Sequence, residues 1–474
     1  MRAIYAQGED AVIRLVEQLL EKIGQLEGRL ETLENQCQKD SHNSSKPPSG
    51  DGFGKRTKSL RPKSGRSSGG QKEHPGSTLE WSEAVDEVVV HQVMQCEGCG
   101  ASLADEAVVN LDLRQVHDLP PVKLVVSEHQ AEEKCCPHCG ALNRAAFPPD
   151  VNSVVQYGSG VKGLMVYLME GQLLPSERVC ELLSEVFGCE VSEGTLYNAR
   201  ERCYEQLAAV EAHLKSGVQG AEVGHFDETG MRVRGKLMWL HVACTSALTY
   251  YFVHAKRGQA AMDAMDILPQ FAGTSVHDGL VSIACYDCAH GLCNPHHLRE
   301  LLFVVERYEQ PWADEMMTLL IDIKDQVEAD KDAGQSTLSA EQLADFEQQY
   351  QQLIAQGLKA NPPPIDDSVP KHKGRPKQSP PKNLLDRLQS NQAAVLAFMH
   401  DFRVPFDHNQ AERDLRMMKL KQKISGGFRS LPGAQMFCRI RGYISTLRKQ
   451  RLKVLNALRL VFMETPLFPA LQPE

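Results

Sequence analysis

Apolar residues at the start of the chain recur at alternating steps of four and three. They are Val12, Val16, Leu19, Ile23, Leu26, Leu30, Leu33 and Cys37. Leu or Val fills one of the two seam positions of this heptad repeat, and β-branched Val16 and Ile23 occupy the other. This combination is typical of a parallel two-stranded coiled coil. We therefore expect residues 1–40 to form a homodimer or a higher oligomer. One amphipathic helix packed on its own domain is the alternative.

Two later stretches contain very few apolar residues. Residues 41–78 are rich in Ser, Gly, Pro and Lys, and residues 361–382 are rich in Pro and Lys. Neither can bury enough surface to offset the entropy of ordering, so both are predicted to be linkers, the first flexible and basic. In the second, Arg375 between Gly374 and Pro376 suits a DNA minor groove. A solvated linker is the simpler interpretation.

Between residues 151 and 215 the apolar spacing is helical. Gly188 ends one predicted helix and Ser192 caps the next, with only "CEV" between the two residues. Two short helices joined in this way resemble a helix-turn-helix, which predicts a helical DNA-binding-like domain. The candidates for reading the major groove are Thr195, Asn198 and Arg200. A plain helical subdomain is the alternative.

After residue 216 the pattern becomes alternating. The stretches "AEVGHFDETGMRV", "KLMWLHVACT" and "LTYYFVHA" predict an antiparallel meander, and "TSVHDG" predicts a fourth short strand. Long helices follow from residue 297. We expect a multidomain α+β protein. Its mixed core spans residues 216–308 and 395–455, with a helical insertion and Pro-rich linker at 309–394 and a C-terminal tail at 456–474.

The composition is that of a soluble globular protein. The chain has 474 residues, 42% of them hydrophobic, and a formal net charge of -9. Its length predicts roughly two to four domains. No apolar run reaches the roughly 18 to 20 residues that span a bilayer, and the first residues do not resemble a secretion signal. We expect a cytoplasmic protein with no membrane partner.

Basic residues are segregated, so the net charge is misleading. From residue 413 to 451 eleven Lys or Arg accompany one acid, and residues 46–72 are basic with one acid. A phosphate backbone meets such local patches and not the average charge, so DNA is an expected partner.

Two pairs of the 14 cysteines have the spacing of metal knuckles. Each pair, Cys96 with Cys99 and Cys136 with Cys139, lies in a Cys-x-x-Cys-Gly turn. Four thiolates suit a tetrahedral Zn²⁺ ion. We expect residues 79–150 to be a zinc-ribbon-like module with a hairpin between the pairs. Reduced turns or a redox pair are the alternatives.

A third group of candidate ligands follows the predicted fourth strand. It comprises Cys285, Cys288, Cys293, His296 and His297. We weigh a second metal site against ordinary packing around a strand and the start of a helix, and packing is the simpler interpretation.

Two carboxylates stand out within the predicted sheet. Asp227 lies in the middle of the first strand, and Asp278 ends the fourth. A carboxylate in a buried strand must be paired or bound to a metal. Together they could converge on a hard divalent cation, which prefers oxygen ligands. Glu228 should point to the opposite side of its strand; His277 and Asp287 are candidate helpers.

The third acid is expected far downstream, in "VPFDHNQAERDLRMMKLKQKISGGFRS". Asp407 or Asn409 is predicted to cap a helix with Glu412 in its first turn. Basic residues follow Glu412 on one face and near it, and we expect them to contact DNA phosphates. These residues are Arg416, Lys419, Lys421, Lys423 and Arg429. An ordinary solvated helix face is the alternative.

The order of these features resembles the transposases of the insertion sequence 66 family over nearly the whole chain. Matching stretches include "NSSKPPSG", the two cysteine knuckles, "DETGMRV", "HDGL" leading to "LCNPHHLREL", and the segment around Glu412. Such proteins are DDE transposases with an RNase H-like catalytic core. The resemblance implies Asp227, Asp278 and Glu412 as the catalytic triad and a helical insertion between the second and third acids.

The implied activity is DNA strand cleavage and strand transfer with Mg²⁺ or Mn²⁺ bound by the triad. The implied partners are the terminal inverted repeats of a bacterial insertion sequence, target DNA and, as a further candidate, accessory proteins of the same element. Two alternatives remain: a catalytically inactive DNA-binding regulatory protein, and an RNase H-like nuclease that cuts without joining.

Overall fold

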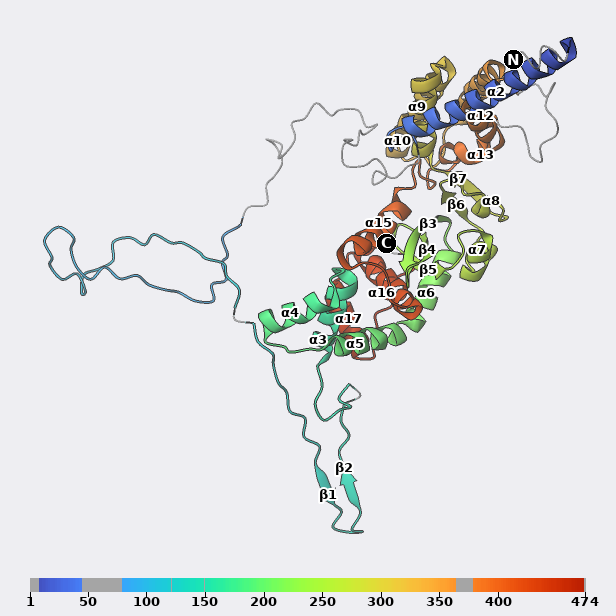
Figure 1. Cartoon of the computed structure of the whole chain (residues 1–474). Helices are drawn as coiled ribbons and strands as arrows, with labels where there is room; N and C mark the ends of the chain where they lie inside the picture. Colours follow the sequence, from blue (N-terminus) through green and yellow to red (C-terminus); the bar gives the residue numbers. More distant parts are fainter. Residues whose placement is uncertain (1–7, 45–78, 121, 149, 364–377, 473–474) are drawn as a thin grey trace.

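A mixed five-stranded sheet lies at the centre of the computed structural model (Figure 1). The structure describes residues 8–44, 79–120, 122–148, 150–363 and 378–472. The linker around Arg375 and most of the basic linker at 41–78 therefore lie outside the described residues. Among the described helices, none combines the length and the apolar character that crossing a membrane requires.

The sheet has the strand order β5-β4-β3-β6-β7. The predicted meander is confirmed: β3 (Val223–Val233), β4 (Lys236–Cys244) and β5 (Thr249–His254) pair antiparallel. The predicted fourth strand is β6 (Thr274–His277), which lies parallel to β3 on its other side. The last strand, β7 (Ala289–Leu292), pairs parallel with β6 and was not predicted.

Helices cover both faces of the sheet. α15 (Asn409–Ser425) and α16 (Leu431–Lys449) pack on the face that carries Met231 and Val242. The segment between β5 and β7 contains α7 (Gln259–Met265), η3 (Leu268–Gln270) and α8 (Val281–Ala284). Their apolar residues pack with Phe226 of β3, which alternation places on the other face.

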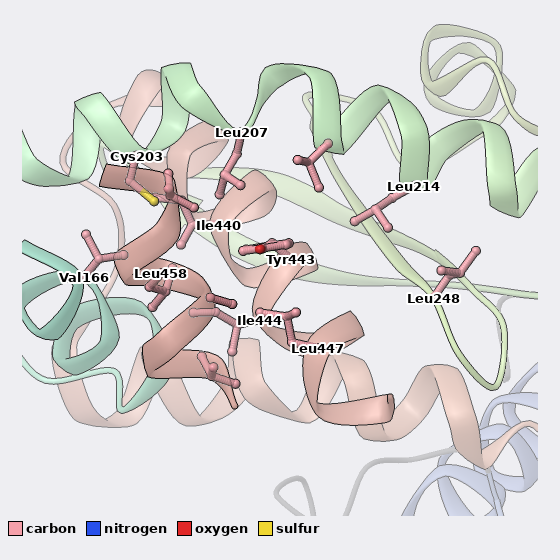
Figure 2. Close-up of a cluster of buried hydrophobic side chains, with 14 of the residues drawn as sticks. Val166, Cys203, Leu207, Leu214, Leu248, Ile440, Tyr443, Ile444, Leu447 and Leu458 are labelled. Carbon is pink, nitrogen blue, oxygen red and sulfur yellow. The ribbon is translucent and has the colours of Figure 1, made fainter. Parts of the chain in front are cut away.

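The helical segment before the sheet shares its core with the C-terminal helices. It contains α3 (Ser159–Val166), the π-helical turn η2 (Tyr167–Gly171), α4 (Ser176–Phe187), α5 (Glu193–Gln206) and α6 (Ala208–Gln219). Figure 2 shows Leu207 and Leu214 of this segment packed with Tyr443 of α16 and Leu458 of α17 (Val454–Phe462). The start of the predicted C-terminal tail therefore belongs to this core.

A second core is formed by the helices between β7 and α15. They are α9 (Asn294–Tyr308), α10 (Pro311–Asp332), α11 (Ala340–Ala360), α12 (Pro380–Ser390), α13 (Gln392–Val395) and α14 (Ala397–His400). Trp312, Tyr350 and Leu385 are buried together in it. The helices of the predicted insertion thus pack on one another, above the sheet in Figure 1.

A hairpin was predicted between the cysteine pairs at residues 114–130. This prediction is wrong, because the described part of the stretch contains no strand. Pro120 and Pro121 interrupt this stretch, and proline offers no N–H to a strand ladder. The two strands of the module, β1 (Glu133–Cys135) and β2 (Leu142–Arg144), instead flank the second knuckle.

The predicted N-terminal helix is α2 (Glu9–Gln38), and its heptad seam is solvent-exposed. Leu19, Ile23 and Leu26 are 49%, 50% and 58% exposed. Near its end, Glu34 pairs with Arg307 of α9 at 2.7 Å, so α2 contacts its own chain through polar groups. The apolar seam remains available to a second copy.

We expect the full chain to dimerise through this seam. Replacing both Leu19 and Leu26 with lysine should give a monomer, because buried lysine charges oppose helix pairing. Gln25→Lys, off the seam, is the matched control. Light scattering that gives the same mass for the double variant, Gln25→Lys and the unchanged protein would contradict this prediction.

Candidate active site

Asp227 lies in β3, between β4 and β6. Alternation along the strand places its side chain on the side of His225 and α15, and places Glu228 on the opposite side. The Glu228 side chain is 1% exposed and pairs with Arg257 at 2.7 Å. The prediction that Glu228 faces away from Asp227 agrees with these contacts.

Asp278 directly follows β6, the parallel neighbour of β3. In the register of this pair His225 lies opposite Val276, so two further residues along both strands bring Asp278 level with Asp227. Adjacent strands are about 4.8 Å apart. The Asp278 carboxylate is exposed and accepts a hydrogen bond from the Leu280 N–H at 3.1 Å, which holds it at the strand end.

Glu412 comes from the first turn of α15, as the sequence predicts. The N-cap is His408 and not Asp407 or Asn409, so the predicted cap is wrong, but the Asn409 N–H donates to Asp407 Oδ1 at 3.0 Å. Ala411, Leu415 and Met418 anchor α15 on the sheet through the core that contains Met231. Glu412 therefore projects from a helix fixed across β3.

The three predicted acids influence one another electrostatically, although their carboxylate oxygens do not all lie within 4.8 Å of one another. Burial raises the pKa of Asp227 well above its usual value, and the charges of Glu228, Asp278 and Glu412 raise it further. In the described part of the chain Asp227 forms no ion pair with a lysine or arginine. Its nearest basic group is Nε2 of His408, at 3.9 Å.

The histidines around the acids do not supply a positive charge that would balance the carboxylates. Burial lowers the pKa of His408 well below its usual value and lowers that of His225 to about 4, and the two rings lie 3.4 Å apart at their Nδ1 atoms. Neutral imidazoles cannot balance a carboxylate, so the acids suit a bound divalent cation. His408 was not predicted as a site residue, and its only signal in the sequence is its place between Asp407 and Asn409.

The two candidate helpers have different environments. His277 is buried at the end of β6, where its Nδ1 accepts a hydrogen bond from the Gly279 N–H at 3.1 Å and its Nε2 lies 3.3 Å from Nδ1 of His290. It therefore supports the loop that carries Asp278. Asp287 is exposed before β7.

The basic residues of α15 do not all share one face. Arg416, Lys419 and Lys423 are exposed, and Lys419 Nζ lies 3.5 Å from the Gly230 carbonyl oxygen, three residues along β3 from Asp227. Lys421 instead lies 4.3 Å from the centre of the Phe428 ring, and burial lowers its pKa.

The loop after α15 returns to the tip of the β3–β4 hairpin. The Phe428 N–H donates to Arg232 O, and the Arg234 N–H donates to Phe428 O, both at 2.9 Å. A Cβ on Gly427 would come within 2.9 Å of Arg232 O, so only glycine allows this close approach. Arg429 is exposed beside the hairpin, so its position is consistent with a phosphate contact.

A buried network holds α15 in place two residues after Glu412. Asp414 accepts hydrogen bonds from Ser445 Oγ at 3.0 Å and Thr249 Oγ1 at 3.2 Å and pairs with Lys449 at 2.8 Å. Asp414 is the one acid among the basic residues of 413–451, and it joins α15, β5 and α16.

The predicted helix-turn-helix helices exist, but one candidate residue is unavailable to DNA. Gly188 ends α4 in the left-handed conformation, and Ser192 caps α5 by accepting from the Thr195 N–H. Arg200 pairs with buried Glu170 of η2 and donates to the Gly433 carbonyl at 2.6 Å. Arg200 therefore joins α5 to α16, and of the three candidates only Asn198 is exposed.

Each cysteine knuckle is preformed. Backbone N–H groups of Cys99 and Gly98 lower the pKa of Cys96, and those of Cys139 and His138 do the same for Cys136. The structure does not bring the four sulfurs together. Within the described ranges, the side chains that lie close enough to one another to bind one metal ion are those of Cys293, His296 and Glu412. The module is mostly exposed, so it has little apolar core of its own to join the knuckles.

We expect a shared Zn²⁺ ion to join them. Replacing both Cys96 and Cys136 with serine should remove about one equivalent of zinc from the purified chain and increase proteolysis within residues 79–150. Cys135→Ser, which changes the neighbouring thiol, should do neither. Elemental analysis showing the same zinc content in all three proteins would count against the site.

Comparison with known protein families identifies the family of the chain. Residues 155–436, more than half of the chain, match the sequence model of the Transposase IS66 family. Residues 5–80 match a Family of unknown function (DUF6444). No curated protein matches the chain. The match at 155–436 contains Asp227, Asp278 and Glu412, and the chain therefore belongs to the Transposase IS66 family.

Proposed function

We propose that this transposase cleaves and joins DNA strands with Asp227, Asp278 and Glu412 as its catalytic triad. The observation that carries the proposal is the origin of the three acids in β3, directly after the parallel neighbour β6, and in α15, with Asp278 and Glu412 both raising the pKa of Asp227. A mixed sheet with one carboxylate on β3 and another directly after the adjacent β6 supports the RNase H-like core that the family resemblance implies.

Mg²⁺ or Mn²⁺ fits this donor set. The acids offer hard oxygen ligands, and the neighbouring His225 and His408 are held neutral by burial, so a cation would balance the carboxylates. When bound, such ions activate the attacking oxygen and stabilise the leaving oxygen of an in-line displacement at phosphorus.

The chain contributes rigid positioning. Asp227 is fixed by its strand and by the hydrogen bond that its Oδ1 accepts from the Glu228 N–H at 2.7 Å. Glu412 is fixed by the packing of α15 and by the Asp414 network two residues away. Metal ligands on strands and packed helices hold their positions better than ligands on loops.

The exposed basic residues of α15 would position the DNA backbone. Lys419 lies beside Gly230, about 10 Å along β3 from Asp227 at the usual rise per residue. Arg416, Lys423 and Arg429 extend this basic surface, which suits the phosphates of an element end or of target DNA.

This assignment predicts that three lysines of α15 contribute unequally to DNA binding. Lys419→Ala and Lys423→Ala should each weaken binding and reduce the salt dependence of the association constant by about one phosphate contact. Lys421→Ala, on the side of Phe428, is the matched control and should leave the salt dependence unchanged. Binding titrations at several salt concentrations that rank Lys421 first would contradict the assignment.

An assay with labelled element ends, a target plasmid and Mg²⁺ tests the function. A transposase yields cut ends with a free 3′-OH and then joined products. Cutting without joining would identify a nuclease, and binding without cutting would identify a DNA-binding regulatory protein. Either outcome would overturn the proposal.

A further inference from the structure

A thiol, an imidazole and a carboxylate meet between α9 and α15. One ligand atom from each of Cys293, His296 and Glu412 lies within 4.8 Å of the other two, and Nε2 of His296 is 4.0 Å from Oε1 of Glu412. Cys293 is the N-cap of α9, and His296 occupies its first turn. An N-cap side chain and the side chain three residues later face each other, as in a capping box.

Cys293 places its sulfur beside His296 and Glu412. Its side chain is buried. Burial and the charge of Glu412 raise the pKa of the thiol, but backbone N–H groups of His408 and His296 act in the opposite direction. These N–H groups and the start of α9 can stabilise a sulfur that has lost its proton to a bound cation.

His296 also has free coordination capacity. Its Nδ1 is buried and has no hydrogen-bond partner in the part of the chain that the structure describes. The imidazole therefore has a ring nitrogen that no described protein group occupies.

We propose that Cys293, His296 and Glu412 bind one divalent transition-metal ion of the Zn²⁺ type. One sulfur, one nitrogen and one oxygen ligand suit zinc and disfavour Mg²⁺, which requires oxygen ligands. Ligand atoms around tetrahedral zinc are about 3.3 to 3.8 Å apart, so the three side chains need to move together by about 1 Å. Three protein ligands leave one coordination position open.

This site shares Glu412 with the proposed catalytic triad but does not rest on the proposed function, because binding needs no DNA. Glu412 would have two competing uses. Zn²⁺ at Cys293 and His296 would hold this carboxylate and thereby weaken the binding of Mg²⁺ to the triad.

Metal content of the full chain tests the proposal. The Cys96→Ser, Cys136→Ser variant is used as the background, so that zinc bound by the cysteine knuckles does not contribute to the measured zinc content. The protein is stripped with a chelator under reducing conditions, refilled with Zn²⁺ and separated from free ion. We expect about one equivalent of zinc in this background and close to none after adding Cys293→Ser or His296→Gln.

Two controls keep the result interpretable. Cys285→Ser changes an exposed thiol outside the cluster and should retain the zinc. Asp227→Asn should also retain it, so loss of the triad and loss of this site are distinguishable. Should Cys293→Ser fail to fold, His296→Gln still decides. Equal zinc in the background protein and in a folded His296→Gln variant would overturn the proposal.

Discussion

Replacing Asp227 with asparagine is expected to lower the rates of DNA cleavage and joining by about a thousandfold or more. The amide has the shape of the carboxylate but lacks the charge that holds a divalent cation. Binding to the element end should persist, because the basic residues of α15 and Arg429 are unchanged. Single-turnover cleavage and a binding titration on the same DNA measure the two effects separately.

Glu228→Gln is the matched control for this change. Glu228 is the next residue, and it is also buried and acidic, but it lies on the other face of β3 and pairs with Arg257. We expect cleavage to stay within about tenfold of the unchanged protein. If Glu228→Gln were inactive while Asp227→Asn retained activity, the triad and the register of β3 would have to be reassigned.

Replacing Lys449 with methionine is expected to lower the free energy of unfolding by about 3 to 5 kcal/mol. Asp414 and Lys449 each have side chains only 9% exposed and lie 2.8 Å apart, so the change leaves a buried carboxylate without its cation. The Thr245 and Leu248 carbonyls also lose a donor at 2.8 Å. Chemical denaturation of the full chain measures the loss.

Two comparisons test the cause of that loss. Lys453→Met removes an exposed lysine and should change the free energy of unfolding by no more than about 0.5 kcal/mol. Adding Asp414→Asn to Lys449→Met should cost less than the sum of the single changes, since the double variant has no unpaired charge. Additive losses would show that the pair contributes no coupling.

Much of the sheet was predictable because its signals are local. Alternation predicted β3, β4 and β5, and the turn at Arg234 and Gly235, both at positive φ, joins the first two as a tight hairpin. β7 was not predictable in the same way. Its four residues, "AHGL", show little strand preference, and they form a strand because β6 offers a parallel edge.

The position of the acids was predictable to the level of residues, but their surroundings were not. A strand and a strand end indicated Asp227 and Asp278, and a capped helix with a basic face indicated Glu412. The neutral histidines around them come from segments more than 100 residues apart, as His225 and His408 show. Nothing in the local sequence signals such a contact.

Charged residues on helices were the least predictable. Arg200 lies on the expected recognition helix, yet its partner Glu170 comes from a π-helical turn 30 residues earlier. Lys421 lies within the basic run of α15, yet it packs over Phe428. In both cases tertiary contacts decide whether the basic side chain can contact DNA. Helical periodicity in the sequence does not reveal these contacts.

Localised cleavage by bound iron tests the central claim most directly. Fe²⁺ replaces Mg²⁺ in oxygen-ligand sites, and with peroxide and a reductant it generates radicals that cut the polypeptide nearby. We predict cuts close to Asp227, Asp278 and Glu412 in the full chain, suppressed by excess Mg²⁺ and reduced in Asp227→Asn. Cuts that avoid Asp227 and Asp278, or that are unaffected by Mg²⁺, would contradict a metal centre formed by these three acids.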